Sequence, residues 1–155
     1  MNILATQYSL PRKSLEIYVS GCKGDDAFGH CHNCHNPETW DFNQGIYYKD
    51  ELPKILTKIE DFSSLIKRVE IFGGEPNDQN LEELEDLLTI LKNTNKELWV
   101  WTRYNLKDCP DFEKKLCDYI KTGEYNEGLK CDDNIQYGIK LATSNQKINK
   151  KGIDY

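Results

Sequence analysis

The pattern of apolar and polar positions along the chain predicts strands that alternate with helices. Short runs rich in β-branched and aromatic residues, several of them ended by glycine, are typical of strands. Such runs lie at residues 14–21, 68–74, 96–104, 119–121 and 136–142. Apolar residues at helical spacing predict helices over residues 49–68 and 80–95, and a short helix from residue 111. The clearest helix is the second, whose apolar face is a stripe of leucines: Leu81, Leu84, Leu87, Leu88 and Leu91.

The spacing of these elements predicts the class of fold. Successive strands begin about thirty residues apart, an interval typical of βαβ units and a parallel sheet. The carboxyl ends of parallel strands meet at one edge, where such folds place their functional groups. A length of 155 residues fits one domain. We therefore predict an α/β fold with one domain, residues 1–155, that ends in a short polar tail at residues 145–155.

The charge balance argues against nucleic-acid binding. The net charge is −6 and the acidic residues are spread along the chain, whereas phosphate binding needs clustered lysine and arginine. No apolar run approaches the length of a membrane span, and the first residues lack the basic-then-apolar order of a signal peptide. We therefore expect a cytoplasmic protein that binds neither nucleic acid nor a membrane, in a compartment that keeps thiols reduced.

Half of the cysteines lie together in the loop that follows the first predicted strand. Cys31 and Cys34 are separated by two residues, so both sulfurs can face one metal centre. Cys22 can join them if residues 23–30 loop out, and the glycines and aspartates of that segment suit turns. Thiolates at this spacing are typical ligands of iron–sulfur clusters and of zinc.

Two metals fit this loop. Three cysteines would leave one iron of a [4Fe–4S] cluster open to a small molecule, because such a cluster normally takes four thiolates. Zinc could instead be held by the three thiols and one imidazole, from His30, His32 or His35. A loop of reduced thiols without metal is a third interpretation, but it leaves the clustering of the residues unexplained.

The second predicted strand ends in "GGEP", residues 73–76. In a parallel sheet this loop opens beside the cysteine loop. Two glycines let a ligand approach the backbone closely, and Glu75 offers a carboxylate to an ammonium group. The alternative is a simple turn from strand to helix with Glu75 in solvent. A structural zinc site gives this loop no role, whereas a cluster that binds an amino-acid-like ligand does.

This combination of motifs resembles the radical S-adenosylmethionine (SAM) enzymes, and more narrowly the activating enzymes of anaerobic, class III ribonucleotide reductases. The resemblance is carried by the three-cysteine loop, "NPETW", "GGEP" and "WVWTRY", and it continues into "DYIKTGEYNE" and "IKLATSNQKI". It extends from about residue 15 to about residue 148. Two positions depart from the common pattern. The first two cysteines have eight residues between them instead of three, and Asn33 stands where many relatives carry an aromatic residue.

The resemblance implies a fold and a set of ligands. The expected fold is a partial (βα) barrel of about five or six mostly parallel strands, since a full barrel needs about 250 residues. Cys22, Cys31 and Cys34 would ligate three irons of a [4Fe–4S] cluster, and the amino and carboxylate groups of SAM would chelate the fourth. The residues implied for cofactor binding are Gly73, Gly74, Glu75, Asn33, Thr102 and Arg103.

The resemblance also implies a reaction carried out by the cluster and SAM, in which no side chain of the protein takes part chemically. A reductant such as flavodoxin or ferredoxin would supply one electron, and SAM cleavage would give methionine and a 5′-deoxyadenosyl radical. That radical would take a hydrogen atom from a glycine of a large reductase subunit. The alternatives are a radical SAM enzyme acting on a small molecule, similar to the 7-carboxy-7-deazaguanine synthases, and a zinc-binding module without catalysis.

The other chemistry-bearing residues have weaker patterns. Asn36 and Trp40 either pack over the cluster or belong to the core. We expect Trp99 and Trp101, which share one face of a strand, to pack in the core or against a partner. The wide spacing of the remaining cysteines predicts ordinary reduced thiols. These residues are Cys109, Cys117 and Cys131. Near the C-terminus, Asn145 and Gln146 either contact SAM or close the end of the barrel.

Overall fold

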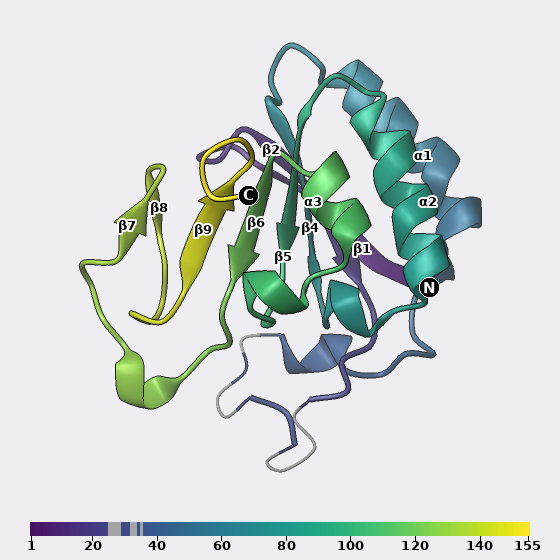
Figure 1. Ribbon diagram of the computed structural model, residues 1–155. Helices are drawn as coiled ribbons and strands as arrows, with labels where there is room; N and C mark the ends of the chain where they lie inside the picture. Colours follow the sequence, from purple (N-terminus) through teal and green to yellow (C-terminus); the bar gives the residue numbers. More distant parts are fainter. Residues whose placement is uncertain (25–28, 32–33, 35) are drawn as a thin grey trace.

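A seven-stranded sheet forms the centre of the computed structural model, which describes residues 1–24, 29–31, 34 and 36–155 (Figure 1). The strand order is β3-β1-β2-β4-β5-β6-β9. The bounds are β1 (Asn2–Ser9), β2 (Ser14–Val19), β3 (Ile46–Tyr47), β4 (Arg68–Gly73), β5 (Glu97–Trp101), β6 (Tyr119–Thr122) and β9 (Lys147–Lys150). A separate hairpin is formed by β7 (Ile135–Gln136) and β8 (Ile139–Lys140).

Three α-helices pack against one face of the sheet (Figure 1). They are α1 (Tyr48–Asp61), α2 (Leu81–Lys92) and α3 (Asp111–Leu116). Short 3₁₀ helices follow the strands: η1 (Pro37–Thr39), η2 (Pro76–Asp78), η3 (Leu106–Asp108) and η4 (Glu127–Leu129). The chain moves from β2 to β4, β5 and β6 in one direction across the sheet, and right-handed crossovers then place every connecting helix on the same face.

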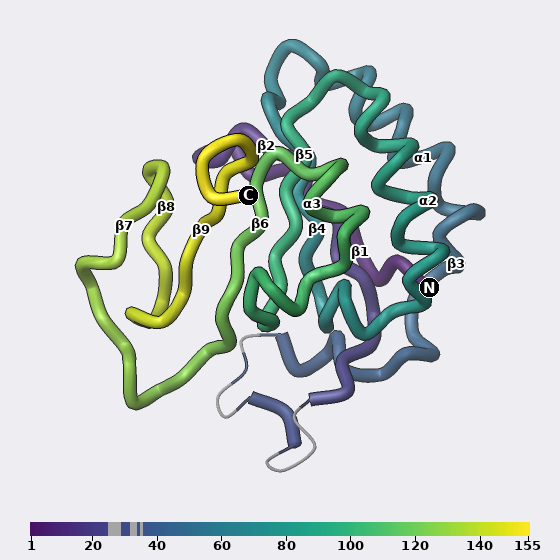
Figure 2. Tube along the Cα trace, viewed as in Figure 1, coloured from purple at the N-terminus to yellow at the C-terminus, as the bar shows by residue number. Residues whose placement is uncertain are grey.

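The predicted α/β fold with a mostly parallel central sheet is confirmed. The four central strands β2, β4, β5 and β6 are parallel, and the outer strands β1, β3 and β9 are antiparallel to their neighbours. The sheet has seven strands rather than five or six, because β1 and β3 extend one edge and β9 extends the other. In Figure 2 the yellow C-terminal segment runs beside β6, at the edge opposite to β1 and β3.

Two sequence predictions at the C-terminal end are wrong. The single strand predicted at residues 136–142 is instead the β7–β8 hairpin, whose turn has positive φ at Tyr137 (50°) and Gly138 (75°). The segment expected as a solvated tail contains β9, which pairs with β6 and buries Ile148 and Asn149. The strand has lysine at both ends and only one buried apolar residue, so its composition indicated a solvated segment.

The core lies between the helices and the sheet. Inward residues of β2, β4 and β5 meet the leucine stripe of α2, in which Leu84, Leu87, Leu88 and Leu91 are fully buried. Leu81, the first leucine of the stripe, is 43% exposed. Asn80 caps this helix, because its side-chain oxygen accepts hydrogen bonds from the backbone N–H groups of Glu82 and Glu83 at 3.0 and 3.1 Å. Among the described residues, no helix has the length and apolar character needed to cross a membrane.

Candidate functional site

The cysteine loop and the "GGEP" loop meet at the carboxyl edge of the parallel strands, as predicted. The backbone N–H of Gly74 donates to the carbonyl of Val19 at 2.9 Å, and that of Glu75 donates to the carbonyl of Gly21 at 2.8 Å. The side chain of Gln79 donates to the same Gly21 carbonyl at 2.9 Å. These bonds join the base of the cysteine loop to the start of η2.

Both glycines of the "GGEP" loop are required by this contact. A Cβ atom on Gly74 would lie 2.1 Å from the Gly21 carbonyl oxygen, and one on Gly73 would lie 2.1 Å from the Val19 carbonyl oxygen. Gly73 also has a φ of +129°, a conformation that L side chains rarely adopt. The glycines therefore allow two backbone segments to touch, a role that exists whether or not a ligand also approaches them.

The long interval between the first two cysteines is closed by His30. Its Nε2 atom lies 2.8 Å from the Cys22 carbonyl oxygen, and its ring stacks on Trp40 with centroids 3.9 Å apart. A Cβ atom on Gly24 would lie 2.6 Å from the backbone of Gly29, so the two ends of the segment touch. The chain thus returns to Cys22 just before it reaches Cys31.

One cavity of about 180 Å³ contains every predicted site residue that the structure describes. It is lined by Cys22, Cys31, Cys34, Gly73, Gly74, Glu75, Thr102 and Arg103. Asn33, the remaining predicted cofactor residue, lies outside the described residues, as do His32 and His35. Asn36, Trp40 and Gln146 also line the cavity.

The thiols around this cavity suit a soft metal centre. All three are free, and burial raises the pKa of Cys22 to about 11 and also raises the pKa of Cys31, where Cys34 adds to the effect. Within the described ranges, no three histidine, cysteine or carboxylate side chains are already arranged around one metal position. Cys22, Cys31 and Cys34 nevertheless line one cavity, and three thiolates are the number that would leave one iron of a [4Fe–4S] cluster open.

Glu75 is a buried carboxylate held by three donors. The Thr102 hydroxyl donates to it at 2.6 Å, the Arg103 backbone N–H at 2.7 Å and the Asn77 backbone N–H at 3.0 Å. Its side chain is 2% exposed, and burial raises its pKa. An ionised carboxylate accepts about four hydrogen bonds, so roughly one position stays open on Glu75, which lines the cavity. Glu75 thus anchors the end of β5 in addition to facing the cavity.

Asp78 is a site residue that the sequence pattern did not reveal. It is 4% exposed, and it accepts hydrogen bonds from the Lys23 backbone N–H at 2.7 Å and the Tyr104 hydroxyl at 2.7 Å. The Arg103 guanidinium lies 3.5 Å from the same carboxylate. Asp78 therefore ties the start of the cysteine loop to the end of β5. Its sequence signal was weak, because an aspartate after "GGEP" reads as an ordinary polar turn residue.

Lys121 is the second residue that sequence reasoning missed. It lies in β6 opposite Trp101 of β5, is 8% exposed and lines the cavity of the cysteines. Its ammonium group donates to the Gly123 carbonyl at 2.6 Å, and burial lowers its pKa to about 8. A buried lysine in a strand is uncommon unless a charge partner is present. The signal available in the sequence was its place in the strand predicted at residues 119–121, two residues after Tyr119.

Trp101, the last residue of β5, lines the cysteine cavity. Its indole N–H donates to Glu70 at 2.9 Å, and Arg12 lies over its ring at 4.4 Å while pairing with Glu70 at 2.7 Å. The ring also stacks on Phe72 with centroids 4.7 Å apart. The expectation of core packing is confirmed for Trp99, which is 2% exposed, whereas Trp101 faces the cavity.

Comparison with known proteins decides the family. Residues 12–148 match the family model described as "4Fe-4S single cluster domain". A relative from Enterobacteria phage T4, named anaerobic ribonucleoside-triphosphate reductase-activating protein, is 31% identical over 121 residues, which cover 73% of this chain and 71% of the relative. Proteins with the same name from Vibrio cholerae (29% over 114 residues, 71% and 70% covered) and Escherichia coli K12 (25% over 146 residues, 90% and 89% covered) are also similar. The chain belongs to this family of iron–sulfur activating proteins.

Family membership resolves the metal question that the loop alone left open. The chain carries a 4Fe–4S single cluster domain, so the iron–sulfur interpretation holds over zinc. Cys22, Cys31 and Cys34 share one cavity, and Cys31 and Cys34 also line a second. The other cysteines lie away from it. Cys109 and Cys117 are buried in the helical core and Cys131 is half-buried, which fits ordinary thiols.

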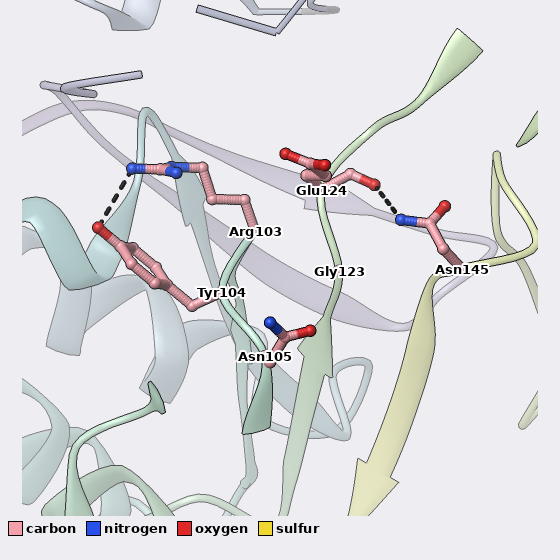
Figure 3. A pocket seen from close by; sticks show the side chains of 6 residues that line it. All are labelled: Arg103, Tyr104, Asn105, Gly123, Glu124 and Asn145. Carbon is pink, nitrogen blue, oxygen red and sulfur yellow. Dashed lines mark hydrogen bonds between the residues drawn. The ribbon is translucent and has the colours of Figure 1, made fainter. Parts of the chain in front are cut away.

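Two further cavities share lining residues with the cysteine cavity. The first, about 260 Å³ in volume, lies between the ends of β5 and β6 and shares Arg103, Gly123 and Glu124 with the cysteine cavity (Figure 3). Asn145 closes it by donating to the Glu124 carbonyl at 3.0 Å. The second, about 290 Å³, runs from Cys31 and Cys34 past Trp101 and Lys121 to residues 140–142.

Proposed function

We propose that this protein is a radical SAM activating enzyme that generates a glycyl radical on an anaerobic ribonucleotide reductase. The observation that carries the proposal is the single cavity in which three thiols face the "GGEP" loop, in a chain of the activating-protein family. The open sheet supports a single-domain partial barrel, because helices cover one face and the strands do not close on themselves. A flavodoxin or ferredoxin would serve as the electron donor.

The cluster and SAM, when bound, supply the one-electron chemistry, and this chain's residues hold and orient them. Cys22, Cys31 and Cys34 would ligate three irons. The open lone pair of Glu75 and the backbone of the adjacent glycines face the side of the cavity where an ammonium group would bind. The cationic side chains that line the same cavity suit a carboxylate: Lys121 and Arg103.

The cavity drawn in Figure 3 is suited to the nucleoside part of SAM. It is continuous with the cysteine cavity through Arg103, Gly123 and Glu124. Polar side chains of Asn105, Asn145 and Glu124 surround it, and ribose hydroxyls bind such groups. A ligand that spans both cavities would place its amino-acid end at Glu75 and its sugar at the ends of β5 and β6.

The groove that ends at residues 140–142 is suited to a segment of the reductase. It opens from Cys31 and Cys34, so a chain lying in it would reach the position where the radical forms. Its outer wall is made by Leu141 and Ala142, whose backbone groups are engaged with Asn134, Cys131 and Gln146. A preformed wall of this kind lets a partner bind without ordering the loop first.

The proposal is tested by anaerobic reconstitution with iron and sulfide. We expect a brown protein with a reducible [4Fe–4S] signal that changes when SAM is added. Cys31→Ala should abolish SAM cleavage, and Cys131→Ala, a cysteine outside the cysteine cavity, should cleave SAM at the wild-type rate. A colourless protein with one tightly bound zinc, or wild-type cleavage by Cys31→Ala, would overturn the proposal.

A further inference from the structure

A buried glutamate lies behind the cavity wall and has no part in the function proposed above. Glu113 belongs to α3, on the helical side of the sheet, and its side chain is fully buried. Its Oε2 atom accepts a hydrogen bond from the Asn77 side-chain amide at 3.3 Å. Its Oε1 atom has no hydrogen-bond partner within the part of the chain that the structure describes. An ionisable group in such a place needs a reason, since burial of a lone charge is costly.

Asn77 connects Glu113 to the site. Its side-chain amide also lies 3.3 Å from the Thr102 hydroxyl oxygen, and its backbone N–H donates to Glu75 at 3.0 Å. Thr102 in turn donates to the same oxygen of Glu75 at 2.6 Å. Three donors fix the Glu75 carboxylate, and two of them depend on Asn77. One is the backbone N–H of Asn77, and the other is the Thr102 hydroxyl, which lies beside the Asn77 side-chain amide that also contacts Glu113.

Two carboxylates share this buried network, and they differ in their donors. Glu75 accepts from two backbone N–H groups and a hydroxyl, which favours its charged form. Glu113 accepts from one amide, and burial raises its pKa to about 8. The other titratable groups around Glu113 are Glu75, Cys109, Cys117 and Tyr155, and the cation Lys114 lies on the same helix. Burial raises the pKa of both carboxyl groups, and the larger set of donors on Glu75 favours its charged form, so Glu113 is the more readily protonated of the two.

We propose that Glu113 is a positioning residue, which holds Asn77 and through it fixes Glu75 and Thr102 at the wall of the cysteine cavity. This role rests on the proposed function to the extent that the wall binds SAM. A neutral acid satisfies it, whereas an ionised Glu113 adds a second negative charge behind Glu75 and repels the loop that carries it. Binding at the wall then weakens as the pH rises through the titration of Glu113.

The test compares Glu113→Gln and Glu113→Ala in the reconstituted protein, with the exposed Glu85→Gln as the matched control. SAM binding is measured from pH 6.5 to 9 through its change of the cluster spectrum. Because Lys121 also loses its charge near pH 8, every variant should lose some affinity above that pH, but we expect the wild type and Glu85→Gln to lose distinctly more than Glu113→Gln. Glu113→Ala should bind about tenfold more weakly than Glu113→Gln at every pH, the usual cost of removing a supporting side chain.

A second readout does not depend on SAM. The infrared band of a protonated carboxylic acid should be present at pH 7 in the wild type and in Glu85→Gln, and should be reduced in Glu113→Gln. Identical pH profiles for wild type and Glu113→Gln, or an unchanged infrared band, would overturn the role of Glu113 while the proposed function stands. A wild-type spectrum that ignores SAM at every pH would overturn the proposed function and, with it, this role.

Discussion

His30 and Cys22 are joined across the eight-residue interval, with the imidazole Nε2 atom 2.8 Å from the Cys22 carbonyl oxygen. The imidazole ring also stacks on Trp40. The interval is therefore closed at its base by a side chain that sits next to the second cysteine. The longer spacing is compatible with three ligands on one cavity because His30 returns to the Cys22 carbonyl, and both Cys22 and Cys31 line that cavity.

Replacing His30 with alanine should weaken this closure. We expect the reconstituted cluster of His30→Ala to be lost about fivefold faster in air, since a net hydrogen bond contributes about 1 kcal/mol. Lys23→Ala is the matched control, because Lys23 is tied to Asp78 through its backbone N–H. Decay is followed by the visible absorbance of the cluster. Equal decay rates for the two variants would show that His30 does not close the loop.

Gly74→Ala should destabilise the fold itself. The new methyl group would lie 2.1 Å from the Gly21 carbonyl oxygen, so the two loops must separate. We expect a loss of about 1–3 kcal/mol in the free energy of unfolding in urea, the range for overpacked sites. Gly128→Ala is the control, because its closest neighbour is the movable side chain of Asn126 at 3.3 Å. A Gly74→Ala protein as stable as wild type would contradict the contact between the loops.

Glu113 should make stability depend on pH. Its pKa in the folded chain, about 8, lies above its usual value of 4.5, so the folded state binds the proton more tightly than the unfolded state. The free energy of unfolding should therefore fall as the pH rises from about 4.5 to about 8, by on the order of 4 kcal/mol in this contribution. Glu113→Gln should remove that slope in urea unfolding at pH 5, 7 and 8.5. A wild-type curve parallel to that of Glu113→Gln would show that Glu113 is not buried as described.

Lys121 should contribute to SAM binding through its charge. We expect Lys121→Met to bind SAM about tenfold more weakly, because a buried cation facing a carboxylate contributes about 1.5–3 kcal/mol. Lys107→Met removes an exposed lysine and is the control. Binding is read from the spectral change of the cluster with SAM. Equal affinities for the two variants would exclude Lys121 from the binding wall.

The sequence predicted the centre of the fold and the paired loops, for a physical reason. Strands buried on the helical face read as short β-branched runs, and the carboxyl edge of a parallel sheet brings their loops together. Cys22, Cys31, Cys34 and Glu75 could therefore be placed near one another without coordinates. Conversely, β1 and β9 have much polar sequence, and the pairing of β9 with β6 joins strands that the β7–β8 hairpin separates in the chain.

The residues that sequence reasoning missed share a second feature. Asp78, Lys121 and Glu113 are charged side chains whose burial follows from tertiary packing, and no local pattern marks them. Glu113 lies in a short, highly charged helix, "DFEKKL", and a glutamate in such a helix is ordinarily expected to be exposed to solvent. Its contact with Asn77 joins residues 36 positions apart. Periodicity finds apolar faces, whereas a buried charge is recognised only when its partners are known.

Ala142 should control access of the reductase to the cluster site. It is half-buried, lines the groove that opens from Cys31 and Cys34, and does not line the cavity that contains Glu75. A tryptophan there would fill the groove while the backbone bonds of Ala142 to Cys131 and Gln146 stay available.

We therefore expect Ala142→Trp to form at least about tenfold less glycyl radical on the reductase, as measured by electron paramagnetic resonance. Ser144→Trp places the same side chain two residues away at an exposed position outside the groove, and it should form the radical as the wild type does. The SAM-induced change of the cluster spectrum, recorded on each sample, separates a blocked groove from a damaged site. Radical formation by Ala142→Trp at the level of Ser144→Trp would show that the reductase segment enters by another route.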